Sequence, residues 1–154
     1  MKINVATTED VPELSELLKS LFAQEAEFSP NSALQTKGLA EIVSNPKVGN
    51  ILVARDGNRI LGMANLLYTV STALGSTVAI LEDMVVSSAA RGENVGSQIL
   101  DHAITLAIER GCKRITLLTD ADNVRAHRFY ERHGFVRSPM IPFRLNLDER
   151  ELVE

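Results

Sequence analysis

Apolar residues recur along the chain at two spacings, one typical of helices and one typical of strands. Helical spacing predicts four helices, over residues 10–25, 34–44, 95–110 and 123–133. Alternating and β-branched runs predict strands over residues 2–6, 50–55, 59–70, 77–86, 115–118 and 143–147. The turn Asp56-Gly57-Asn58 separates two of these strands and is a strong hairpin signal, so we expect them to pair antiparallel.

A loop of small residues joins the strand over residues 77–86 to the helix over residues 95–110. The loop includes an Arg-Gly turn, Arg91-Gly92. Backbone N–H groups at a helix N-terminus lack partners within the helix, and they converge on a point where an anion such as a pyrophosphate is bound favourably. This segment therefore predicts a phosphate-binding loop.

Two motifs give this loop a family resemblance. Residues 91–97 read R-G-x-x-x-G-S, and residues 123–135 read N-x-x-A-x-x-F-Y-x-x-x-G-F. Together they resemble the acetyl-CoA-binding core of the GNAT N-acetyltransferase superfamily, over nearly the whole chain. The resemblance implies an α/β (α+β) fold with a mixed, mostly antiparallel sheet of six to seven strands. About four helices would flank this sheet, two strands would follow the last helix, and a splayed parallel strand pair would bind acetyl-CoA.

The resemblance also implies which residues bind the cofactor. The pyrophosphate would lie against the loop and the helix start, at Arg91, Gly92, Asn94, Val95, Gly96 and Ser97. Main-chain groups of Met84 and Val86 would pair with the pantetheine arm as an added strand would. The second motif would border the cofactor through Asn123, Ala126 and Tyr130, and Asn123 also occupies the capping position of its helix.

The chain departs from the family loop at one position. The family motif has a glycine where this sequence has Asn94. Asn is the non-glycine residue that most readily adopts left-handed backbone angles. We therefore expect the geometry of the loop to remain available, with cofactor binding at most weakened.

Acetyl transfer to an amine needs a group that accepts the amine proton and a group that protonates the departing thiolate. The run L-E-D-x-x-V-x-S-x-x-R-G, residues 81–92, resembles that of polyamine and glucosamine-phosphate acetyltransferases, and this resemblance assigns the base to Glu82. Successive side chains of a strand point to opposite faces, so at most one of Glu82 and Asp83 should face the substrate. Asp83 or a water molecule as base, or two solvated or ion-paired carboxylates, are the alternatives.

Tyr130 matches the family tyrosine that lies near the cofactor sulfur and protonates the thiolate. A phenol is a neutral donor at pH 7 and can stabilise developing negative charge. The alternative is an ordinary packed aromatic residue beside Phe129. His102, His127 and His133 are expected to be exposed helix residues, and their spacing predicts no metal site.

The composition of the chain limits the classes of function that it can have. The chain has 154 residues, a formal charge of -4 and no basic run, which fits one domain over residues 1–154 and argues against nucleic-acid binding. No apolar stretch approaches membrane-spanning length and no signal pattern opens the chain. One cysteine, Cys112, cannot form an internal disulfide, so we expect a half-buried thiol in a cytoplasmic protein.

These observations predict an acetyl-CoA-dependent N-acetyltransferase that acts on a primary amine of a small molecule, such as a polyamine, an amino sugar or an amino acid-like compound. The amine would attack directly within a ternary complex, and the protein could form a homodimer. A peptide or protein acetyltransferase, with a groove between residues 28–35 and 68–75, is one alternative. A non-catalytic acyl-CoA-binding module is another. A nucleotide P-loop is excluded, because no G-x-x-x-x-G-K-[ST] run occurs.

Overall fold

The computed structural model describes residues 1–23, 31–90 and 92–148. One sheet has the order β1 (Lys2–Val5), β2 (Gly49–Asp56), β3 (Arg59–Ser71), β4 (Ser76–Val86) and β5 (Ile115–Leu117). The α-helices are α1 (Val11–Phe22), α2 (Ser32–Val43), α3 (Val95–Glu109) and α4 (Val124–Arg132). Neighbouring strands are antiparallel except for the parallel pair of β4 and β5, as expected. The expected end of the first helix, residue 25, lies outside the described residues.

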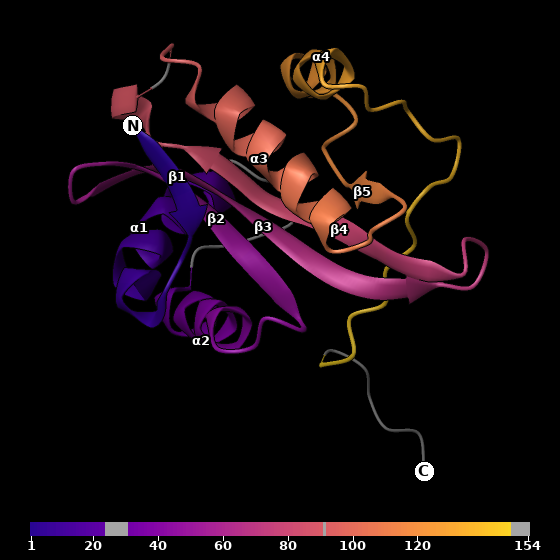
Figure 1. The fold of residues 1–154 in the computed structure, drawn as a ribbon, viewed down its shortest axis with the longest axis horizontal. Coiled ribbons are helices and arrows are strands. Elements are labelled where there is room, and N and C mark those ends of the chain that lie inside the picture. Colours follow the sequence, from indigo (N-terminus) through magenta and orange to yellow (C-terminus); the bar gives the residue numbers. More distant parts are fainter. Residues whose placement is uncertain (24–30, 91, 149–154) are drawn as a thin grey trace.

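Helices cover both faces of the sheet, which therefore separates two cores. The helices α1 and α2 lie on one face and α3 on the other (Figure 1). Alternate residues of β2 enter opposite cores. Ile51 and Val53 pack with α1 and α2, whereas Leu52 and Ala54 pack with α3. The alternation read from the sequence thus divides this central strand between the two cores.

A β-bulge interrupts the pairing of β3 with β4. Asn65 pairs with Glu82, and beyond that pair the single residue Ala64 lies opposite both Asp83 and Met84. Asp83 has a φ of 54°, a left-handed angle that is uncommon for a non-glycine residue. A bulge of this kind bends the strand and redirects the side chains that follow it.

Asparagine side chains cap the N-termini of two helices. Asn31 Oδ1 accepts a hydrogen bond of 3.2 Å from the backbone N–H of Leu34, so α2 begins slightly earlier than predicted. Asn123 Oδ1 accepts one of 3.1 Å from the backbone N–H of Ala126 at the start of α4. The predicted capping role of Asn123 is confirmed.

The segment after α4 does not form the expected strands. Residues 135–148 contain no helix or strand, so the predicted strand over residues 143–147 is wrong, and the described sheet has five strands rather than six or seven. A strand-like sequence forms a strand only where it pairs with a neighbour, and residues 143–147 pair with no strand among the described residues, although one edge of β5 is free. Six large apolar side chains after Phe135 are 64–93% exposed: Val136, Met140, Ile141, Phe143, Leu145 and Leu147.

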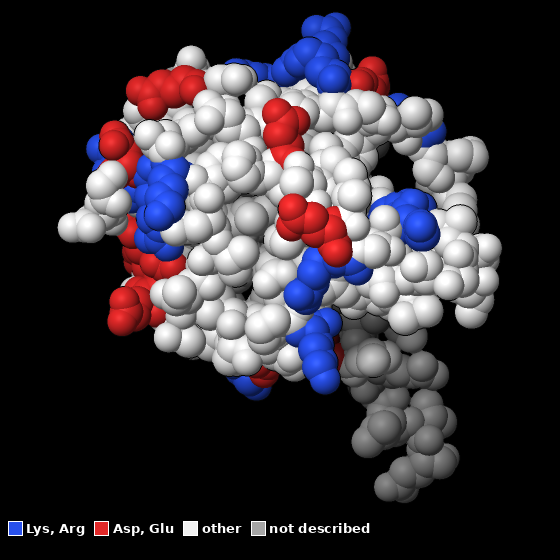
Figure 2. All heavy atoms as spheres, viewed as in Figure 1, with Lys and Arg blue, Asp and Glu red and all other residues white. Residues whose placement is uncertain are grey.

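The surface agrees with the charge pattern of the sequence. On the face drawn in Figure 2, acidic and basic side chains are interspersed without an extended area of one sign. The same view shows an opening between the body and the segment after α4, which arches away from the helix. None of the described helices is long and apolar enough to span a membrane. Cys112 is half-buried as predicted, and burial raises the pKa of its thiol.

Candidate active site

A cleft of about 280 Å³ opens where β4 and β5 separate. Their parallel pairing ends at Leu81 and Leu117, and β4 continues beyond this pair without a partner on that side among the described residues. Unpaired backbone groups of a strand edge can bind an extended ligand as an added strand. The splay predicted for this strand pair is therefore present. The cleft is lined by residues that include Glu82, Asp83, Met84, Asn123, Ala126, Tyr130, Pro142 and Arg144.

Glu82 and Asp83 both line this cleft, which corrects our expectation that at most one of them would face the substrate. The bulge and the positive φ of Asp83 break the regular alternation of side chains along β4. The Asp83 carboxylate is partly buried and accepts a hydrogen bond of 3.3 Å from Asn65 Nδ2, whereas Glu82 is exposed. The bulge thus brings two candidate bases together where the sequence analysis expected one.

The environment of these carboxylates suits proton transfer. Although Glu82 is exposed as a residue, the protein around its carboxyl group partly desolvates it and raises its pKa, and the nearby charge of Asp83 raises the pKa further. Burial also raises the pKa of Asp83, against the lowering effect of its hydrogen bond from Asn65. A carboxylate with a raised pKa binds a proton more readily, so either group can act as the base for an ammonium substrate.

Tyr130, near the end of α4, lines the same cleft. Its ring packs edge-on against Phe129 and Phe135, with ring centroids 5.2 and 5.7 Å away. These contacts hold the ring in place at the cleft. The packing interpretation and the catalytic interpretation of Tyr130 are therefore compatible, because the ring packs while the residue borders the cleft.

The loop before α3 has the geometry that an anion site needs. Asn94 has the expected left-handed angles, φ 63° and ψ 23°, and its side chain makes no capping hydrogen bond. The N–H groups of the first turn of α3 therefore remain available to an anion. A Cβ built on Gly96 would lie 3.5 Å from each of three side chains of β4 and α4, an ordinary contact. Internal packing does not demand this glycine. Arg91, also predicted here, lies outside the described residues.

A chain of hydrogen bonds that we did not predict from the sequence connects the first turns of α3 to the end of α4. His133 Nε2 lies 3.1 Å from Ser97 Oγ, and His133 Nδ1 lies 3.1 Å from Asp101 Oδ1. The side chain of His133 is therefore mostly buried, not exposed as we expected. The only signal in the sequence is the spacing of Ser97 and Asp101, which places them on one face of α3.

The other two histidines, His102 and His127, differ in their exposure. His102 is exposed, as expected, whereas His127 is half-buried with Nε2 2.9 Å from the carbonyl oxygen of Asp120. Among the residues that the structure describes, no group of three or more His, Cys, Asp or Glu side chains could hold a metal ion.

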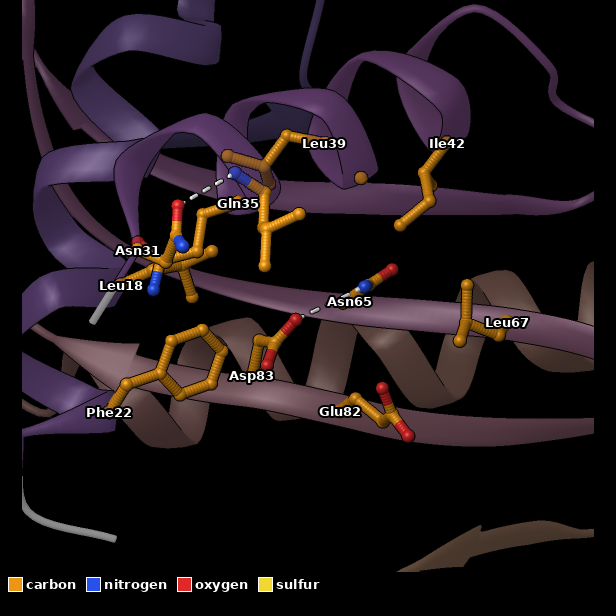
Figure 3. Close-up of a pocket in the computed structure, with 12 residues that line it drawn as sticks. Leu18, Phe22, Asn31, Gln35, Leu39, Ile42, Asn65, Leu67, Glu82 and Asp83 are labelled. Carbon is orange, nitrogen blue, oxygen red and sulfur yellow. Dashed lines mark hydrogen bonds between the residues drawn. The ribbon is translucent and has the colours of Figure 1, made fainter. Parts of the chain in front are cut away.

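A second cavity, of about 360 Å³, lies between the helices α1 and α2 and the strands β3 and β4 (Figure 3). Apolar side chains such as Leu18 and Leu39 line it from the helices, and Asn65, Glu82 and Asp83 line it from the strands. Since Glu82 and Asp83 also line the first cleft, these two residues belong to the walls of both spaces. This arrangement can bring two ligands together, one from each side of the carboxylate pair.

The structure describes only part of the peptide groove considered from the sequence. Residues 32–35 belong to α2 and residues 68–71 belong to β3, so half of the residues in the two expected loops belong to regular structure. Residues 28–30 lie outside the described part of the chain.

Known proteins match the chain over most of its length. The model of the Acetyltransferase (GNAT) family matches residues 12–135. An aminoalkylphosphonate N-acetyltransferase of Salmonella typhimurium is 29% identical over 133 residues, which cover 86% of this chain and 83% of that protein. The uncharacterized N-acetyltransferase YhfO of Bacillus subtilis is 30% identical over 139 residues, 88% of this chain and 89% of that protein.

The fold matches as well. A crystal structure from Clostridium acetobutylicum, of a "predicted acetyltransferase with acetyl-CoA", has a TM-score of 0.79 at 20% identity, with 97% of each chain covered. At this identity the likeness shows the fold alone, and it confirms the fold class. Together with the family match, these findings identify the chain as a member of the GNAT acetyltransferase family and an acetyl-CoA-dependent N-acetyltransferase.

Proposed function

We propose that the protein acetylates a primary amine of a small molecule by direct attack within a ternary complex. The amine nitrogen attacks the thioester carbonyl of acetyl-CoA, an amide bond forms and the carbon–sulfur bond breaks. Glu82 accepts the proton that the amine loses, and Tyr130 gives a proton to the departing thiolate. The observation that carries this proposal is that Glu82, Asp83 and Tyr130 line one cleft at the point where β4 and β5 separate.

We propose that acetyl-CoA binds along the open edge of β4 and the N-terminus of α3. The exposed strand edge suits the pantetheine arm, and the first turn of α3 suits the pyrophosphate. The proposed contacts are Met84, Val86, Arg91, Gly92, Asn94, Val95, Gly96, Ser97, Asn123, Ala126 and Tyr130. The chain from Ser97 through His133 to Asp101 supports this site, because it fixes α4 against the start of α3.

Acetyl-CoA is expected to raise the melting temperature of the protein. A ligand that binds only the native state adds about 2.7 kcal/mol to the free energy of unfolding at a hundredfold excess over its dissociation constant. We propose that residues 1–154 form one domain, so unfolding should be a single transition that shifts as a whole. The measurement is a melting scan with acetyl-CoA and, for comparison, with ATP. No shift with millimolar acetyl-CoA, or a larger one with ATP, would contradict the cofactor assignment.

The acceptor is proposed to be a small molecule rather than a peptide. The Salmonella relative is named for a small amine-containing substrate, and α2 and β3 occupy half of the positions where a peptide groove was considered. Release of free thiol from acetyl-CoA in the presence of an amine separates this proposal from a binding module without turnover.

We also propose that the protein forms a homodimer through residues 136–148. Exposed apolar side chains are concentrated in this segment, and clusters of this kind mark interaction sites. The segment pairs with no described strand of its own chain, and the free edge of β5 in a second copy offers it a pairing partner.

Light scattering during gel filtration is expected to give the mass of a dimer for the wild-type protein. Phe143, 93% exposed, is the side chain whose burial would contribute most, so Phe143→Asp should weaken dimerisation about tenfold or more. Val70→Asp is the matched control, because Val70 is equally apolar and 72% exposed but lies on β3. A wild-type monomer at high concentration would contradict the dimer, and equal effects of the two variants would contradict the assigned segment.

A further inference from the structure

The cavity between the helices α1 and α2 and the sheet contains hydrogen-bond acceptors that lack partners. The side chains of Gln35 and Asn65 line this cavity, and the residues are only 8% and 2% exposed. Gln35 Oε1 and Asn65 Oδ1 have no hydrogen-bond partner among the described residues. A buried acceptor without a partner costs free energy that a donor on a bound ligand recovers. The two oxygens therefore indicate a ligand that donates hydrogen bonds.

The orientation of the Asn65 amide follows from its neighbour. Nδ2 donates a hydrogen bond of 3.3 Å to Asp83 Oδ2, and Figure 3 shows the amide oxygen on the side away from Asp83. Turning the amide round would place its oxygen against the oxygen of a carboxylate, which accepts and does not donate. Asp83 thus fixes the amide in the orientation that leaves the buried Asn65 Oδ1 without a hydrogen-bond partner among the described residues.

The ionisable side chains among the described residues that line this cavity are all acidic. Glu82 and Asp83 line it, and none of its described lining residues is Lys, Arg or His. Arg144 lines the neighbouring cleft and not this cavity. A carboxylate or phosphonate here would lie beside two carboxylates without a countercharge, whereas an ammonium group would be stabilised.

Most of the other lining residues are aliphatic, and Phe22 and Asn31 add an aromatic ring and a further polar side chain. Leu39 and Ile42 of α2 face Leu67 of β3 across the cavity, together with Leu18 of α1 (Figure 3). Such a surface suits a chain of methylene groups, which gain free energy when they leave water. The cavity therefore combines an aliphatic lining with acceptors and negative charge.

We infer that this cavity binds the methylene chain and the second nitrogen of a diamine or polyamine, whose first nitrogen is acetylated beside Glu82 and Asp83. An ammonium group has three N–H donors, and Gln35 Oε1 and Asn65 Oδ1 supply acceptors for the nitrogen that does not react. Gln35 and Asn65 thus determine specificity, and the inference depends on the acetyl transfer proposed above. The expected substrate differs in charge from an aminoalkylphosphonate, the compound for which the Salmonella relative is named.

The first experiment compares amines by release of free thiol from acetyl-CoA. Straight diamines with three to five methylenes are tested against butylamine, γ-aminobutyrate and aminopropylphosphonate. The best diamine is expected to exceed butylamine in kcat/KM by about tenfold or more, the gain of hydrogen bonds to a charged donor. The two acids should be the poorest substrates. Equal rates for diamines and butylamine, or a preference for the phosphonate, would overturn the inference.

A variant then tests the cavity itself. Gln35→Met removes the acceptor oxygen and keeps the length of the side chain, so kcat/KM for the best diamine should fall about tenfold, mainly through a higher KM. The value for butylamine should stay the same. Replacing a buried polar group that lacks a partner should not lower the melting temperature. Glu41→Met is the matched control, because Glu41 is exposed on α2 and does not line the cavity. An unchanged ratio of diamine to butylamine in Gln35→Met would contradict the role of Gln35.

Calorimetric titration with diaminobutane and butylamine separates this inference from the proposed function. Diaminobutane that binds more tightly than butylamine without turnover would support the cavity assignment and contradict acetyl transfer. Diaminobutane that neither binds nor reacts would overturn the cavity assignment. The melting shift with acetyl-CoA would in that case still test the cofactor site independently.

Discussion

Tyr130→Phe is expected to lower the turnover number about 10²-fold or more, the range found for general acids and bases, with little change in affinity for acetyl-CoA. The substitution removes only the hydroxyl group that would protonate the thiolate. The phenylalanine ring can keep the edge-on contacts that Tyr130 makes with Phe129 and Phe135. The loss should therefore appear in kcat, measured as thiol release with saturating amine.

Tyr68→Phe is the matched control, because Tyr68 and Tyr130 are the two tyrosines of the chain. The Tyr68 hydroxyl donates a hydrogen bond of 2.6 Å to Asn50 Oδ1 and lines neither of the two cavities described. This variant should lose some stability and keep its turnover number. If the two variants lost activity equally, Tyr130 would have no special part in the chemistry.

Glu82→Gln is the second change expected to lower turnover about 10²-fold or more. The missing carboxylate would no longer accept the proton of the attacking amine. As the pH rises, more of the amine is already deprotonated, so the deficit should shrink. A deficit that is the same at every pH would indicate that Glu82 positions the substrate instead.

Asp83→Asn provides the comparison that the bulge makes necessary. Both carboxylates line the cleft, so either could be the base. If Asp83→Asn lost more turnover than Glu82→Gln, and if that loss shrank as the pH rose, Asp83 would be the base. Unchanged turnover in both variants, with a confirmed substrate, would mean that neither is the base.

The raised pKa of Glu82 determines the direction in which the Glu82→Gln substitution should change stability. The folded state holds the Glu82 proton more tightly than the unfolded chain does, so this contribution to stability is present at low pH and is lost as the pH rises through the raised pKa. The Glu82→Gln variant has no carboxyl group at this position and therefore does not lose stability in this way as the pH rises. Its melting temperature at neutral pH should equal or exceed that of the wild type, which separates a catalytic defect from a folding defect.

Elements with strong local signals could be predicted from the sequence. The apolar face of α3, with Ile99 and Ala103 fully buried, follows helical spacing, and Gly57 closes the hairpin between β2 and β3 at a φ of 61°. The left-handed conformation of Asn94 was also predictable, because few other residues adopt it without strain. Each of these features depends on neighbours in the sequence.

Features that depend on distant residues were not predictable. The bulge at Asp83 arises from the pairing register of β3 and β4, and it overturned the simple alternation of Glu82 and Asp83. The bonds of His133 to Ser97 and Asp101 require α3 and α4 to come together. The expected strand over residues 143–147 had the right pattern and no partner. In each case the tertiary structure determined a feature that the local sequence pattern does not determine.

The short parallel contact between β4 and β5 has a consequence for local unfolding. Three residue pairs join these strands, whereas nine pairs join β3 to β4. Opening of a native protein starts where the fewest backbone and packing interactions must break. The edge that would bind acetyl-CoA should therefore open more often than the antiparallel part of the sheet, and its amide hydrogens should exchange with solvent sooner. A cofactor bound across both strands would close this edge and slow that exchange.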